Sequence, residues 1–140
     1  MAEMGSVAAS ARALRTVPLF AGLSDDSIAG VLKTAAPFDV PAGQVLIEAG
    51  QAGAGLFVIE EGTVAVGAGP QKIELGAGEF FGELALLTSD ATHAARVSAK
   101  TPVSGLAIAR NDFRALLERE PKVVLAMLEV LAQRLASAMH

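Results

Sequence analysis

The sequence predicts a mainly β domain with flanking helices, built as a sandwich or barrel. Between residues 37 and 109 the apolar runs are short and are separated by turns rich in glycine, which is the pattern of such all-β folds. Before and after this region, apolar residues recur at helical spacing instead. The length of 140 residues suits one domain with one real core, and we find no repeat and no linker.

Two helices are expected before the β region. Residues 6–17 are rich in alanine and predict a first helix that ends at Pro18, so 1–17 form an N-terminal helical segment and 18–140 form the domain. Ser24 is a good N-cap, with Asp25 and Asp26 in the favourable first turn. Apolar residues then follow at helical spacing, and they predict a second helix over residues 25–35.

The β region from 37 to 109 contains a series of predicted strands. They comprise residues 45–47, 56–59, 63–66, 72–75 and 103–108, together with a strand around Val97.

The C-terminal region from 111 to 138 predicts a pair of helices. Asn111 or Asp112 caps the first, and Pro121 opens the second. On the second helix, apolar residues at spacings of four, three and four form a stripe, which we call the leucine stripe: Val124, Leu128, Leu131 and Leu135. The stripe has two interpretations. It packs on its own domain, or it also pairs with the same helix of a second copy.

Composition excludes several classes of protein. The formal net charge is −4 and no cluster of Lys and Arg appears, which argues against binding nucleic acid. The apolar runs are broken well before the ~18 residues that a membrane span requires. With no cysteine, two histidines and no catalytic or metal-ligand spacing, the sequence predicts neither an enzyme nor a metal site. We see no secretion signal, so we expect a cytoplasmic location.

The segment from Gly78 to Val97 carries the most chemical information. Gly82 lets the backbone turn and approach a ligand closely. The amides of residues 83–85 then lie at the start of a predicted short helix, where unpaired N–H groups attract anions. Glu83 beside them can accept hydrogen bonds from a sugar diol. These groups together predict an anionic ligand that bears a sugar.

Two runs in this segment resemble the phosphate-binding cassette of the cyclic-nucleotide-binding domain family. They are Phe-Gly-Glu-Leu-Ala-Leu at 81–86 and His-Ala-Ala-Arg-Val at 93–97. The family includes bacterial catabolite activators, regulatory subunits of cyclic-AMP-dependent kinase and cyclic-nucleotide-gated channels. Residues 18–24 and 57–66 also look like family segments, and the resemblance covers about residues 17–137. It implies a double-stranded β-helix, that is, a jelly-roll-like β-roll, with N-terminal helices and a C-terminal helix pair.

The resemblance also implies a role for each site residue. In the family, the glycine and the amides after it hold the cyclic phosphate, and the glutamate, here Glu83, binds the ribose 2′-hydroxyl. The C-terminal helix covers the base, and its cover here would fall near Ala138 and Met139. The candidate ligand-binding residues, with the hydrophobic wall last, are therefore Phe81, Gly82, Glu83, Leu84, Ala85, His93, Ala94, Val66 and Ile73. Ala94 stands where some members carry a Thr or Ser that helps to hold guanine, which favours cyclic AMP over cyclic GMP.

The sequence departs from the family at one position, because His93 stands where the family has the arginine that pairs with the phosphate. Arg96, three residues on, occupies a slot that usually points away from the pocket. Loss of one charge-assisted hydrogen bond would weaken binding about 10- to 100-fold. Either His93 is a weaker, pH-sensitive phosphate ligand, or it begins a strand in a domain that no longer binds cyclic nucleotide well.

Two functional hypotheses follow. In the first, the chain is a regulatory module that binds cyclic AMP in the β-roll and signals through its C-terminal helix. In the second, it is a degenerate domain of the same type that acts as a protein-interaction or dimerisation module. The sequence does not decide whether the chain stands alone or belongs to a longer protein.

Overall fold

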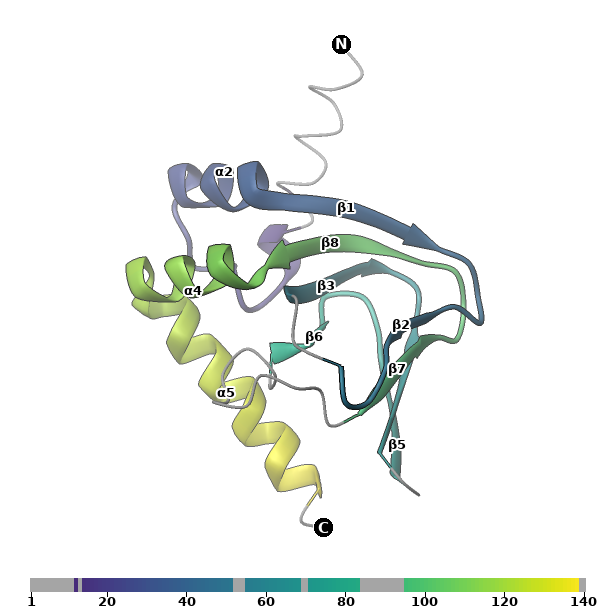
Figure 1. Ribbon diagram of the computed structural model, residues 1–140. Helices are drawn as coiled ribbons and strands as arrows, with labels where there is room; N and C mark the ends of the chain where they lie inside the picture. Colours follow the sequence, from purple (N-terminus) through teal and green to yellow (C-terminus); the bar gives the residue numbers. More distant parts are fainter. Residues whose placement is uncertain (1–11, 13, 52–54, 69–70, 84–94, 139–140) are drawn as a thin grey trace. The chain divides into compact units, whose positions relative to one another are not determined.

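The β region of the computed structural model contains two four-stranded sheets (Figure 1). The structure describes residues 12, 14–51, 55–68, 71–83 and 95–138. In the first sheet the strand order is β1 (Ala35–Val40), β8 (Val103–Ala109), β3 (Gly55–Glu61) and β6 (Phe80–Phe81). In the second it is β2 (Val45–Ile47), β7 (Arg96–Ala99), β4 (Val64–Ala68) and β5 (Gln71–Leu75). Every pairing is antiparallel, so the predicted all-β region is confirmed.

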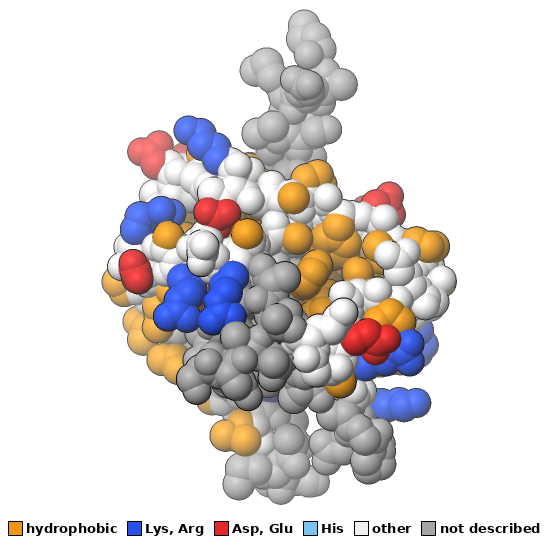
Figure 2. Space-filling model, in the orientation of Figure 1, with side chains coloured by type: hydrophobic (Ala, Val, Ile, Leu, Met, Phe, Trp, Pro, Cys, Tyr) orange, Lys and Arg blue, Asp and Glu red, His pale blue; other side chains and the backbone are white. Residues whose placement is uncertain are grey.

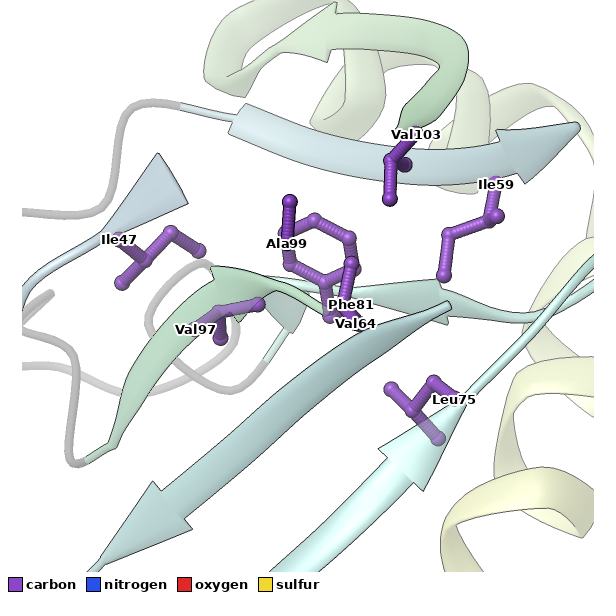
Figure 3. Packing of buried hydrophobic residues seen from close by; sticks show 8 residues of the cluster. All are labelled: Ile47, Ile59, Val64, Leu75, Phe81, Val97, Ala99 and Val103. Atoms are coloured by element: carbon purple, nitrogen blue, oxygen red, sulfur yellow. The ribbon is translucent and has the colours of Figure 1, made fainter. Parts of the chain in front are cut away.

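The main hydrophobic core of the β region lies between these two sheets. Its buried side chains come from seven of the strands and converge on one another (Figure 3): Ile47, Ile59, Val64, Leu75, Phe81, Val97, Ala99 and Val103. Apart from the small Ala99, each of these side chains contributes roughly 1.5–3 kcal/mol when it is withdrawn from water. The core therefore holds the two sheets together and also contains Phe81, the first residue of the candidate site.

Two strands differ from the predictions. β1 begins at Ala35, directly after the helix α2 (Asp25–Thr34). The β region was predicted to begin at Pro37, so the observed strand starts two residues earlier and contains that proline. β1 pairs with β8 alone, so it is an edge strand, where a proline without an N–H costs no hydrogen bond on the open side. β6 was not predicted as a strand, because two residues give no alternating pattern.

The helices form their own unit, which consists of residues 1–33 and 114–140, while residues 34–113 form the second unit. Of the predicted helix at 6–17, residues 12 and 14–16 are helical, and residues 1–11 and 13 lie outside the described residues. The N–H of Ser27 donates to the Oγ of Ser24 at 3.2 Å, which confirms Ser24 as the N-cap of α2. Ser27 in turn donates its hydroxyl to Glu120, at the junction between α4 (Arg110–Arg119) and α5 (Pro121–Ala138).

The C-terminal helix pair forms as predicted, with two corrections. α4 begins at Arg110, so Asn111 and Asp112 lie in its first turn and are not its cap; a shift of one residue is ordinary at helix ends.

The second correction concerns the leucine stripe. α5 buries Val123 and Met127, whereas Leu128 and Leu135 are 57% and 62% exposed. Figure 2 shows hydrophobic side chains at the surface where α5 runs in Figure 1. The interpretation that the stripe packs on its own domain is therefore wrong for these two leucines, because the buried face of α5 lies beside the stripe.

Candidate functional site

Gly82 forms a sharp turn at the end of β6. Its φ of +94° lies in the left-handed region that side chains disfavour. A Cβ built on Gly82 would lie 2.7 Å from the carbonyl oxygen of Gly55, and 3.6 Å and 3.7 Å from Phe57 Cδ2 and Ile47 Cδ1. Both the dihedral angle and the close approach of the β3 backbone therefore require glycine at this position.

Glu83 follows directly and has a helical conformation. Glu83 is only 4% exposed, and no other charged residue in the described part of the chain is buried. A carboxylate is expensive to bury unless it accepts hydrogen bonds. Glu83 already has an interaction partner within the chain, and since a carboxylate has about four lone-pair sites, it can also accept a hydrogen bond from a hydroxyl-bearing ligand.

Two further predicted residues, Val66 and Ile73, lie opposite each other on β4 and β5. Because paired residues of neighbouring strands project to the same face, their side chains lie on one side of the sheet. Val66 packs against the core that contains Phe81, whereas Ile73 is 52% exposed. The structure thus joins Val66 to the surroundings of Phe81 and leaves Ile73 as an uncovered apolar side chain beside it.

Four predicted site residues fall in segment 84–94, which lies outside the described residues: Leu84, Ala85, His93 and Ala94.

Arg96 is the cation nearest in sequence to that segment. Its Nε lies 3.1 Å from an Oε of Glu48, and both side chains are at least half exposed. Val97, the next residue of β7, belongs to the buried core. Since successive side chains of a strand point to opposite faces, Arg96 faces outward, away from the space between the sheets.

In the part of the chain that the structure describes, no group of acidic residues and histidines is arranged to hold a metal.

Glu60 is an ionisable residue that sequence reasoning did not single out. It lies on β3 at an irregularity in the pairing with β8, between Ile59 and Glu61. Burial, and to a lesser extent the charge of Glu61, raise the pKa of the Glu60 carboxyl above its ordinary value. No pattern in the sequence indicates this, because the burial of a strand residue depends on the tertiary packing around it.

Phe57 and Gly55 were also missed as contributors to the site, although both line the space where a side chain on Gly82 would lie. The only available signal was their position in a predicted strand. Which strand becomes their neighbour is decided by the tertiary fold.

Comparison with known proteins identifies this arrangement. The family model described as the cyclic nucleotide-binding domain matches residues 37–120, which include both sheets from Pro37 onward and the Gly82–Glu83 turn. The chain belongs to the cyclic nucleotide-binding domain family. The predicted resemblance is thus confirmed.

Other cyclic nucleotide-binding domains occur in proteins of several classes. A cyclic nucleotide-gated potassium channel of Rhizobium etli is 40% identical over 107 residues, which are 76% of this chain and 30% of the channel. The cAMP-activated global transcriptional regulator CRP of Haemophilus influenzae is 33% identical over 101 residues, 68% of this chain and 45% of the regulator. The chain therefore spans less than half the length of these relatives.

A solved structure confirms the fold class of this cyclic nucleotide-binding domain. The catabolite activator protein of Thermus thermophilus superposes with a TM-score of 0.73 at 31% identity, over 86% of this chain and 59% of that protein. The two antiparallel sheets with flanking helices match the jelly-roll fold of that protein. The predicted double-stranded β-helix is thus confirmed. Among the described residues, no helix has the length and apolar character to cross a membrane.

Proposed function

We propose that this chain is a regulatory module that binds cyclic AMP in its β-roll and signals through α5. The observation that carries the proposal is the buried carboxylate of Glu83 directly after the left-handed Gly82. In this arrangement Glu83 accepts hydrogen bonds from the ribose, while the amides that follow Gly82 receive the cyclic phosphate. Val66 and Ile73 provide the apolar wall, and the exposed surface of Ile73 is the part that a base would cover.

The choice of cyclic AMP over cyclic GMP rests on Ala94, which has no hydroxyl to hold a guanine. The name of the Haemophilus regulator, a cAMP-activated protein, points to the same nucleotide. We also propose that the domain has no catalytic activity of its own. Its cytoplasmic location stays a prediction of the sequence.

We expect a low affinity for cyclic AMP, because the phosphate-binding site has no arginine to pair with the phosphate. Arg96 faces outward and pairs with Glu48, so it does not replace the missing charge. Backbone amides and His93 remain as the phosphate ligands. A histidine with a reference pKa of about 6.5 is mostly neutral at pH 7, and a bound phosphate favours its charged form. We expect cyclic AMP to bind in the micromolar range or more weakly, and more tightly at pH 6 than at pH 8.

Calorimetry with cyclic AMP and cyclic GMP at pH 6 and pH 8 tests this proposal. The His93→Arg variant should bind about 10- to 100-fold more tightly and lose most of the pH dependence. His140→Arg is the matched control, because His140 is the other histidine of the chain. Equal affinity at the two pH values would exclude a charged His93. Absence of binding by both the wild type and His93→Arg would favour the alternative, a degenerate domain that acts as an interaction module.

A second proposal concerns the partner of α5. Three leucines of α5 are exposed at spacings of three and seven residues: Leu125, Leu128 and Leu135. This spacing is typical of the interface of a helix that pairs with its own copy. We propose that α5 joins two copies of this chain. Light scattering should show a dimer that Leu128→Glu dissociates, whereas Ser137→Glu, also at an exposed position, should not. A monomeric wild type at high concentration would refute this proposal.

A further inference from the structure

Phe57 lies at the centre of a row of three aromatic rings in the first sheet. Phe57 on β3 is paired in register with Phe81 on β6. The two rings are stacked, with centroids 5.0 Å apart and planes 5° from parallel. On the other side, the ring of Phe38 from β1 meets Phe57 edge to face at a centroid distance of 5.6 Å. The row therefore joins an edge strand of the sheet to the strand that ends at the candidate site.

The row exists because β8, which lies between β1 and β3, carries small residues beneath it. Gly105 lies opposite Phe38 and Ala107 lies opposite Phe57. A Cβ on Gly105 would come within 3.0 Å of Phe38 Cε1 and 1.9 Å of the carbonyl oxygen of Val58. A larger residue there would push the rings and strands apart. The small side chains of β8 therefore leave the room that the three aromatic rings occupy.

The Phe57 ring also lies beside the turn itself. A Cβ added to Gly82 would lie 3.6 Å from Phe57 Cδ2, which is van der Waals distance. One ring thus contacts Phe81 by stacking and limits the space beside Gly82. An aliphatic side chain of similar volume would fill the core, but it would not offer a flat face to Phe81.

We propose that Phe57 is a positioning residue for the ligand-binding turn. It acts by holding Phe81 and Gly82, and so the amide of Glu83, in the geometry that receives the ligand. This inference rests on the proposed function for its effect on affinity. Its effect on the turn itself is independent of any ligand.

The test compares Phe57→Leu, which removes the ring, with Phe57→Tyr, which keeps it. Amide hydrogen exchange of Gly82 and Glu83, measured by NMR without ligand, reports the turn directly. The exchange rate should rise in Phe57→Leu and stay near the wild-type value in Phe57→Tyr. The affinity for cyclic AMP should fall about threefold to tenfold in Phe57→Leu, as expected for the loss of an aromatic pair, and return in Phe57→Tyr.

Phe20→Leu is the control, because it makes the same change at a fully buried phenylalanine of the helical unit. It should lower the melting temperature without changing exchange at Gly82 and Glu83. If exchange at the turn is the same in Phe57→Leu as in the wild type, or rises equally in Phe20→Leu, the positioning role is wrong. If exchange rises in Phe57→Leu as expected but the wild type binds no cyclic nucleotide, the positioning role stands and the proposed function fails.

Discussion

Replacing Gly82 by alanine is the sharpest test of the candidate site. The substitution adds one methyl group at a backbone position with a φ of +94°. That methyl would lie 2.7 Å from the carbonyl oxygen of Gly55, closer than such atoms approach in proteins. The oxygen belongs to β3, which is paired with β8 at this point, so it cannot move without disturbing the sheet.

Two costs add in this variant. An L-residue in the left-handed region costs about 1–2 kcal/mol, and a methyl forced against a packed neighbour costs about 1–3 kcal/mol. We therefore expect Gly82→Ala to lower the free energy of unfolding by about 2–5 kcal/mol. For a domain of this size, each kcal/mol is worth about 4 °C in melting temperature, so the decrease should be roughly 8–20 °C.

Gly43→Ala is a matched control. Gly43 has nearly the same φ, +91°, but nothing lies within 4 Å of the added Cβ. The two variants share the backbone strain and the change in unfolded-chain entropy, so their difference isolates the contact with Gly55. Thermal unfolding followed by circular dichroism gives both values, and calorimetry with cyclic AMP gives the effect on affinity. If Gly82→Ala melts no lower than Gly43→Ala, the contact with Gly55 does not constrain the turn.

Three further predictions follow from single residues. Because the pKa of Glu60 is raised in the folded state, folding takes up a proton, and the free energy of unfolding falls as pH rises from the unfolded pKa through the folded pKa. Glu60→Gln should therefore stabilise the protein more at pH 7 than at pH 4, and an equal difference in melting temperature at the two pH values would contradict this. Gly30→Ala, inside α2 with free space around its added methyl, should raise stability by about 0.5–1 kcal/mol, measured by urea unfolding; a loss of stability would show that the helix is packed there. Arg96→Gln should leave the affinity for cyclic AMP within about twofold in calorimetry, because its side chain faces outward, and a tenfold loss would mean that Arg96 reaches the ligand.

Local patterns of sequence were sufficient for much of the fold. The strand at 45–47 was predicted at its observed bounds, and the N-cap at Ser24 forms the expected hydrogen bond. Such features depend on residues a few positions apart, so the residues that form the sequence pattern are also those that contact one another in the structure. Gly82 and Glu83 were identified in the same way, because a glycine turn and the residue after it form one local motif.

The tertiary structure decided what depends on neighbours distant in sequence. Pro37 lies in a strand because β1 is an edge, and Phe57 lies beside the Gly82 turn because β3 pairs with β6. The spacing of leucines on α5 was visible in the sequence, but which face would be buried was not. A periodic pattern records the possible faces of a helix, whereas burial depends on the surfaces that the rest of the chain brings to it. The sequence alone therefore determined the family, most of the strands and the motif, and only packing between distant segments decided the strands β1 and β6 and which residues hold that motif in place.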